Sequence, residues 1–138
     1  DGRLLYEQTA DGIIVATPTG SSAYALSAGG QLIHPSVDAI ALVPISPSRL
    51  TSCPIVIPST SEVEILVHPW KDGGAIFSLD AREEGTLTNS QVFKISVDPK
   101  PLTLLHPLHY NYYQTLQEKL SWETRPMIDW KDQNSDAT

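Results

Sequence analysis

Short apolar runs separated by turn residues predict a chain made mostly of strands. Residues 13–15 and 40–45 form continuous apolar runs, as in buried strands, whereas residues 63–67 place Glu64 between apolar side chains, as in a half-buried strand. Pro44 and Pro47 are expected to end the strand at 40–45. The same patterns predict further strands at residues 4–8, 55–57, 76–79, 92–97 and 102–105.

Two short helices are expected, at residues 23–28 and 110–120. In the second, Tyr112, Tyr113, Leu116 and Leu120 recur at three- and four-residue steps and predict a core or interface face. Turns are expected at residues 71–74 and at the charged residues 82–85. The pattern stops at residue 123, so we expect a domain over residues 1–122 and a polar, poorly ordered tail over residues 123–138.

The elements together predict a mainly β fold. No repeated crossover helices stand between the strands, so two packed sheets are favoured over one parallel sheet. We therefore expect a two-layer, β-sandwich-like domain with one short helix near the start and one short helix near the C-terminal end. The length of 138 residues fits a single domain, since about 100–200 residues per domain is usual.

Residues 11–30 carry the pattern strand, tight polar loop, helix. Asp11-Gly12 is a hairpin turn in this interpretation, and Ser21 or Ser22 caps the helix with a side-chain oxygen. Gly29 and Gly30 end the helix, because glycine adopts left-handed angles at little cost. Backbone N–H groups at such a helix start can meet an anion or a ribose hydroxyl. An equally open interpretation is that Thr, Ser and Gly occur here only because turns need them.

Charge and composition narrow the function. A net charge of −7 argues against a nucleic-acid partner and against an anionic membrane surface. One cysteine, Cys53, cannot form an internal disulfide, so nothing indicates secretion and we expect a cytoplasmic protein. The four histidines are scattered and give no zinc-ligand spacing. A lone histidine such as His34, before Pro35, is expected to be structural.

This loop and helix have the sequence TPTGSSAYALSAGG. The segment is very similar to the TPTGSTAYSLSAGGP signature of NAD kinases. Ser22 stands where Thr is usual, Ala25 where Ser is common and Gln31 where Pro often follows; Ala16 replaces a frequent Ser. The resemblance runs from about Leu5 to Trp122. It includes HPS and DAI at residues 34–40, PISP at 44–47, PIVIP at 54–58 with Cys53 in place of the usual Arg, FSLD at 77–80, and the run YYQTL at 112–116.

The resemblance implies a β-sandwich C-terminal domain that binds NAD in an enzyme phosphorylating the 2′-hydroxyl of its adenosine ribose with ATP. In the family, the positions matching Ser22, Ala23, Tyr24 and Ser27 line the NAD site. Those matching Asp11 and Ser46 reach it from a neighbouring subunit, which implies a homo-oligomer, a dimer or tetramer. The NAD-binding residues that we carry over are Asp11, Thr19, Ser22, Ala23, Tyr24, Ser27, Ser46 and Asp80.

Two family motifs are absent from the sequence: the Gly-Gly-Asp-Gly loop, whose Asp is the general base, and an Asn-Glu pair. We therefore name no catalytic residue and no metal ligand here. Mg²⁺ or another divalent cation is expected to come with ATP. We expect the chain to be a C-terminal portion of a longer polypeptide and to be inactive alone.

Two other functions stay open. The related lipid kinases share the two-domain plan, although the full TPTGSSAY signature favours NAD kinases, and a non-catalytic oligomerisation module would also be rich in strands.

Overall fold

The computed structural model describes residues 1–68, 74–88 and 91–122, and it divides the chain into two compact units, Asp1–Pro99 and Lys100–Thr138. Most of the turn expected at residues 71–74 and the whole tail expected at residues 123–138 lie outside the described residues. The expected domain boundaries therefore stay predictions.

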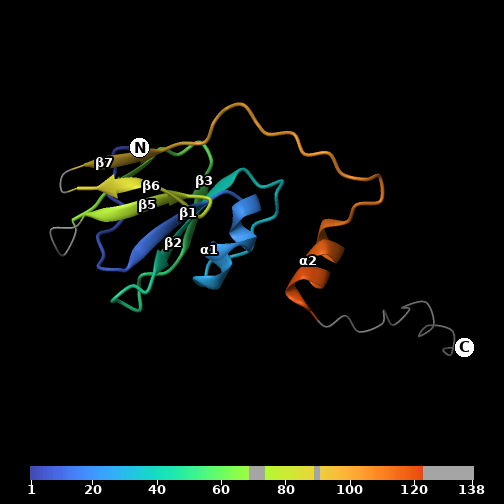
Figure 1. Ribbon diagram of the computed structural model, residues 1–138, viewed down its shortest axis with the longest axis horizontal. Helices are drawn as coiled ribbons and strands as arrows, with labels where there is room; N and C mark the ends of the chain where they lie inside the picture. Colours follow the sequence, from blue (N-terminus) through green and yellow to red (C-terminus); the bar gives the residue numbers. More distant parts are fainter. Residues whose placement is uncertain (69–73, 89–90, 123–138) are drawn as a thin grey trace, which may run out of the picture. The chain divides into compact units, whose positions relative to one another are not determined.

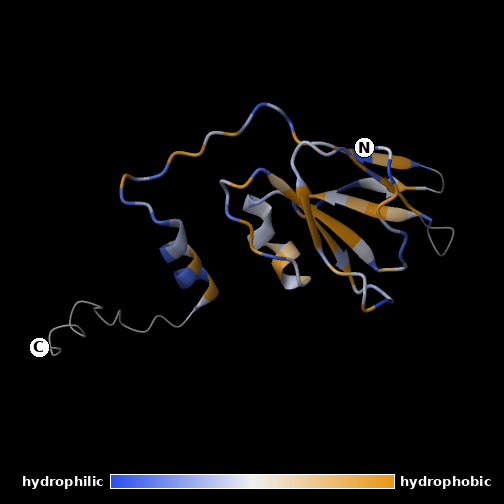
Figure 2. Cartoon of the chain, turned by 180° about the vertical axis from the view of Figure 1, so that it is seen from behind, coloured by the Kyte–Doolittle hydropathy of each residue, from blue (hydrophilic) through white to orange (hydrophobic). Residues whose placement is uncertain are grey.

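A three-stranded antiparallel sheet with the order β1-β2-β3 forms the centre of the first unit (Figure 1). The strands are β1 Gly12–Ala16, β2 Ala39–Ile45 and β3 Ile55–Pro58. The middle strand, β2, is buried over all but its last residue, as its continuous apolar run predicts. Figure 2 shows the apolar character of these strands. The three strands expected at residues 13–15, 40–45 and 55–57 are thus confirmed.

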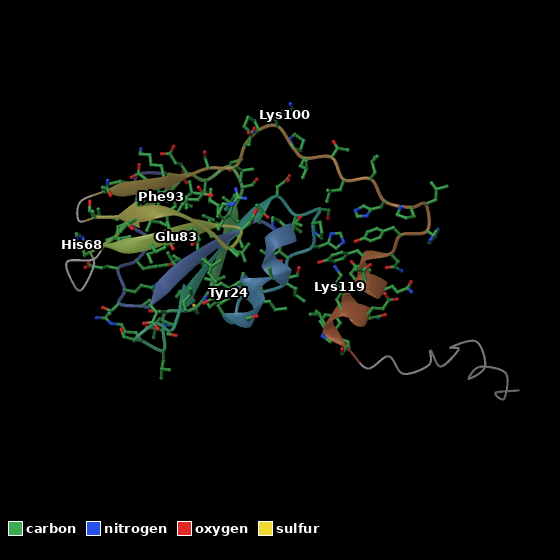
Figure 3. All side chains as sticks on the ribbon, in the orientation of Figure 1. Tyr24, His68, Glu83, Phe93, Lys100 and Lys119 are labelled. Carbon is green, nitrogen blue, oxygen red and sulfur yellow. The ribbon has the colours of Figure 1, made fainter. Side chains whose placement is uncertain are left out.

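Two antiparallel strand pairs complete the β structure of this unit. β4 Val63–Leu66 pairs with β7 Val92–Ile95, and β5 Ala75–Leu79 pairs with β6 Arg82–Leu87. The rings of Phe77 on β5 and Phe93 on β7 lie with their centroids 5.0 Å apart and join the two pairs. Figure 3 labels Phe93 on β7 and Glu83 on β6. The mainly β fold class is confirmed, with the strands in three small sheets.

The core of the first unit lies between the central sheet and two short helices, the 3₁₀ helix η1 Thr19–Ser22 and the α-helix α1 Tyr24–Ser27. Figure 1 shows α1 on one side of β1 and β2, with β5, β6 and β7 on the other. Small residues let the helix approach the sheet closely. The buried cluster consists of Ala16, Ala25, Ile33, Ala41 and Val43.

The second unit contains the helix α2 Tyr112–Leu120, which confirms the helix expected at 110–120. Asn111 caps it, because its side-chain oxygen accepts hydrogen bonds from the N–H groups of Tyr113 and Gln114. Ser121 ends it with a left-handed φ of 52°.

Two expected strands are wrong. Residues 4–8 and 102–105 have no strand structure, and Leu4, Leu102 and Leu105 are more than four-fifths exposed. An apolar run becomes a strand only when a neighbouring strand pairs its N–H and C=O groups, and neither run has such a partner among the described residues.

Two expected turns are also wrong. Residues 82–85 belong to β6, and the turn before them is Asp80-Ala81, where both residues have positive φ (46° and 64°), as a tight two-residue hairpin requires. Asp11-Gly12 forms no hairpin turn, because no strand precedes it: Gly12 begins β1, and the Asp11 N–H donates to the Ile45 carbonyl at 2.9 Å.

The strand expected at residues 40–45 ends at Ile45, as β2 does, but Pro44 does not end it. Pro44 is inside β2, where it pairs with Ile13 of β1. β3 pairs with β2 only over the stretch from Ala39 to Leu42, so β2 is an edge strand on that side at Pro44, a position that tolerates a missing N–H.

Candidate functional site

One face of η1 and α1 is exposed and carries most of the candidate residues. Ser21 and Ala25 point into the core and are buried, at 0% and 1% exposure. Five candidates are exposed on the same segment: Thr19, Ser22, Ala23, Tyr24 and Ser27. We call these five residues the outward face. Because the opposite face of the segment packs against the sheet, the outward face has a rigid support.

Tyr24 is the largest side chain of the outward face, and it is 61% exposed (Figure 3). An aromatic ring that is this exposed on a well-packed segment is available for stacking against a planar ligand. Ser27 lies three residues later and is exposed beside it on the short helix. The arrangement offers one ring and several hydroxyls on one surface.

Three backbone N–H groups of the loop before α1 are already paired. The Gly20 N–H donates to Thr17 Oγ1 at 3.2 Å, and the N–H groups of Ser21 and Ala23 donate to the carbonyls of Pro18 and Gly20. The expected cap is wrong, since no N–H group at either helix start donates to the side-chain oxygen of Ser21 or Ser22. The local reason is that Ser21 is turned into the core instead. Side-chain hydroxyls and the Tyr24 ring, rather than the N–H groups of these three residues, are what the loop offers a ligand.

Asp11 and Ser46 lie together, but at the other end of the central sheet. Both are exposed; Asp11 precedes Gly12, and Ser46 follows Ile45, the residue that pairs with Gly12. The five residues of β1, about 15 Å of strand, separate this end from the start of η1. Ser46 has a φ of 46°, an uncommon conformation for a residue other than glycine. The structure therefore brings Asp11 and Ser46 to each other and not to the outward face.

Asp80 lies in the tight turn between β5 and β6, where it is exposed. Its positive φ is the one that the hairpin turn requires.

His34 contacts its own turn: its Nδ1 lies 2.8 Å from Ser36 Oγ and accepts from the Ser36 N–H at 3.2 Å.

Two open hollows, of about 380 and 250 Å³, flank the N-terminal segment, and none of the candidate residues lines either of them. Glu7 and Arg49 line both. In the smaller hollow the Tyr6 hydroxyl oxygen is buried and has no hydrogen-bond partner among the described residues. Burial raises the pKa of this hydroxyl, and the charge of Cys53 raises it further. Neither of these two hollows therefore belongs to the outward face.

Residues 1–68, 74–88 and 91–122, which the structure describes, contain neither a cluster of metal ligands nor a helix suited to a membrane. No group of three or more His, Cys, Asp or Glu side chains in these ranges could hold a metal ion. No helix there combines the length and the apolar character needed to cross a bilayer.

Comparison with known sequences shows a match to a family described as the ATP-NAD kinase C-terminal domain, over residues 1–106. A protein of Azotobacter vinelandii named NAD kinase is 46% identical over 125 residues, which are 91% of this chain and 42% of that protein. A Psychrobacter arcticus protein of the same name is 48% identical over 122 residues, 88% of this chain and 38% of that protein. The chain thus spans about two fifths of the length of these relatives.

Comparison with solved structures finds the crystal structure of yeast NADH kinase complexed with NADH. The match has a TM-score of 0.76 and 30% sequence identity, and it covers 93% of this chain and 37% of that one.

Proposed function

Because the chain belongs to the NAD kinase family through its ATP-NAD kinase C-terminal domain, we propose that it is the NAD-binding part of an NAD kinase. The reaction is the transfer of the γ-phosphoryl group of ATP to the 2′-hydroxyl of the adenosine ribose of NAD, which gives ADP and NADP. The observation that carries the proposal is the outward face, where the signature residues Tyr24 and Ser27 are exposed on a segment whose other side is the core. The NADH in the matched yeast structure supports a dinucleotide as the ligand.

The chain's role in this reaction is to hold and orient the acceptor. The Tyr24 ring stacks on a nucleoside and its hydroxyl donates a hydrogen bond, while the hydroxyls of Ser22 and Ser27 bind polar groups of the adenosine. Orientation of the acceptor hydroxyl is a large part of phosphoryl-transfer catalysis. The carboxylate that would take the 2′-hydroxyl proton is not among these side chains. The divalent cation, Mg²⁺ or another, comes with ATP and neutralises the charge on its phosphates.

The Tyr24→Ala substitution tests the NAD-binding role. We expect NAD affinity of the chain to fall by about 1–3 kcal/mol, or roughly 5- to 150-fold, because a stacking contact and a hydrogen bond are both lost. Stability should stay near the original value, since Tyr24 is 61% exposed. Calorimetric titration with NAD and thermal unfolding measure the two quantities.

Tyr113→Ala is the matched control for Tyr24→Ala, because Tyr113 is 64% exposed and lies on α2. It should leave NAD affinity unchanged. Equal NAD affinity in the Tyr24→Ala variant and the original chain would remove Tyr24 from the proposed site.

A homo-oligomer is the second part of the proposal. Asp11 and Ser46 lie at the far end of the central sheet from the outward face, so they serve the same dinucleotide only if a second copy brings them to it. Sedimentation at micromolar concentration should show at least a dimer. A monomer at every concentration tested would leave Asp11 and Ser46 outside the NAD site.

A cytoplasmic location is also proposed, since the exposed thiol of Cys53 suits a reducing compartment.

A further inference from the structure

Ser21 is the buried polar side chain of the described core. It has 0% exposure, although its neighbour Gly20 is half-buried and its neighbour Ser22 is exposed. Its Oγ donates to the Pro18 carbonyl at 2.6 Å and accepts from the Ile33 N–H at 2.9 Å. A buried hydroxyl or N–H group without a hydrogen-bond partner destabilises the folded state, and here the Ser21 hydroxyl and the Ile33 N–H are partners.

The bond to Ile33 joins two points twelve residues apart. Between them lie the whole of α1 and the glycines that end it, and the Gly30 N–H donates to the Ala25 carbonyl at 2.8 Å. Ile33 and Ala25 pack in one cluster with Val43 of β2. The segment from Ser21 to Ile33 is therefore a closed loop. It packs against the sheet, and a hydrogen bond to the Ser21 hydroxyl links its two ends.

The outward face is built on this same loop. Ser22 follows Ser21 directly, and Tyr24 and Ser27 follow within six residues on the side away from the core. A shift of the Ser21 backbone would move all three side chains together, whereas the sheet beneath would stay in place through its own ladders.

We propose that Ser21 is a positioning residue for NAD: its buried hydroxyl, by fastening Pro18 to Ile33, sets the place of Ser22, Tyr24 and Ser27. This proposal rests on the proposed function. It differs from a simple turn role, in which Ser21 would need only the bond to the nearby Pro18 carbonyl and the link to Ile33 would be of no consequence for the ligand.

The Ser21→Ala variant of the chain tests this, with Ser36→Ala as the matched control, because Ser36 loses a hydroxyl in an exposed turn. We expect Ser21→Ala to weaken NAD binding by about tenfold, since small misplacements of binding groups carry large penalties. Amide hydrogen exchange should speed up at Ile33 and stay slow at Val43 of the sheet. Ser21→Thr, which keeps a hydroxyl, should retain most of the affinity, and Ser36→Ala all of it.

Each result decides the proposal. Faster exchange at Ile33 with unchanged NAD affinity would overturn it. If Ser21→Ala loses cooperative thermal unfolding, Ser21→Cys replaces it, because it keeps the shape of the side chain in a slightly larger form and weakens the hydrogen bonds. Reduced NAD affinity at an unchanged unfolding midpoint supports the proposal, and full affinity overturns it. Failure of the proposed function is distinct, because then the original chain itself would bind no NAD.

Discussion

The purified chain of residues 1–138 is expected to have no measurable NAD kinase activity when it is given ATP, Mg²⁺ and NAD. The Gly-rich loop that would cradle the donor phosphates and the carboxylate that would take the acceptor proton do not occur in its sequence. Positioning and electrostatic stabilisation carry most of phosphoryl transfer, so a chain that supplies only the acceptor side should lose nearly all of the rate, by a factor of about 10⁵ or more. An NADP-specific dehydrogenase coupled to the reaction measures the product.

The matched experiment is a chimaera in which residues 1–122 replace the corresponding part of the Azotobacter vinelandii NAD kinase. The identity of 46% over 125 residues predicts that the junctions will be tolerated and that the chimaera will make NADP. Turnover by the chain alone at a rate near that of the chimaera would mean that the catalytic groups are in this chain after all.

Gly30→Ala is expected to lower the free energy of unfolding of the first unit strongly. A Cβ at Gly30 would lie 2.7 Å from the Ala25 carbonyl oxygen and 2.8 Å from Val43 Cγ2. The first neighbour is backbone and cannot rotate away, so the turn after α1 must shift away from both Ala25 of α1 and Val43 of β2. We expect a loss of about 3 kcal/mol or more in the free energy of unfolding, measured by urea denaturation.

Gly29→Ala is the control for this substitution. Gly29 has a φ of 88° and no atom within 4 Å of an added Cβ, so its replacement strains the backbone without a clash, at about 1 kcal/mol. If Gly30→Ala lowers the free energy of unfolding no more than Gly29→Ala does, the close contact between α1 and β2 does not hold the unit together.

The pattern of apolar residues predicted strands correctly where the apolar run also pairs with a neighbouring strand. The run 40–45 is buried on both sides in β2, and the alternation at 63–67 matches the half-buried β4. Periodicity shows which side chains can be buried, but not which segment pairs with which, so the unpaired runs 4–8 and 102–105 were predicted as strands. β6 was missed because its hairpin turn places Ala81 at a positive φ, which alanine rarely adopts.

The candidate site was predictable as a segment but not as an arrangement. The signature identified residues 19–27, and the structure places five of the candidates on one exposed face. Sequence alone could not tell Ser21 from Ser22, because both suit a helix cap. Only the packing of Ala25 and Ile33 against Val43 decides which serine turns inward. The distance between Ser46 and the outward face likewise depends on the register of β1 and β2, which local patterns do not encode.

The most direct test of the account is an NMR titration of the ¹⁵N-labelled chain with NAD, which follows the amide signal of each residue. The account predicts that the largest shifts fall on residues 19–27, above all Ser22, Tyr24 and Ser27, and that the amides of β4 to β7 stay unchanged. AMP should reproduce the shifts, since the outward face is proposed to hold the adenosine. Shifts confined to the hollow beside Tyr6 and Arg49, or no saturable shift at millimolar NAD, would contradict it.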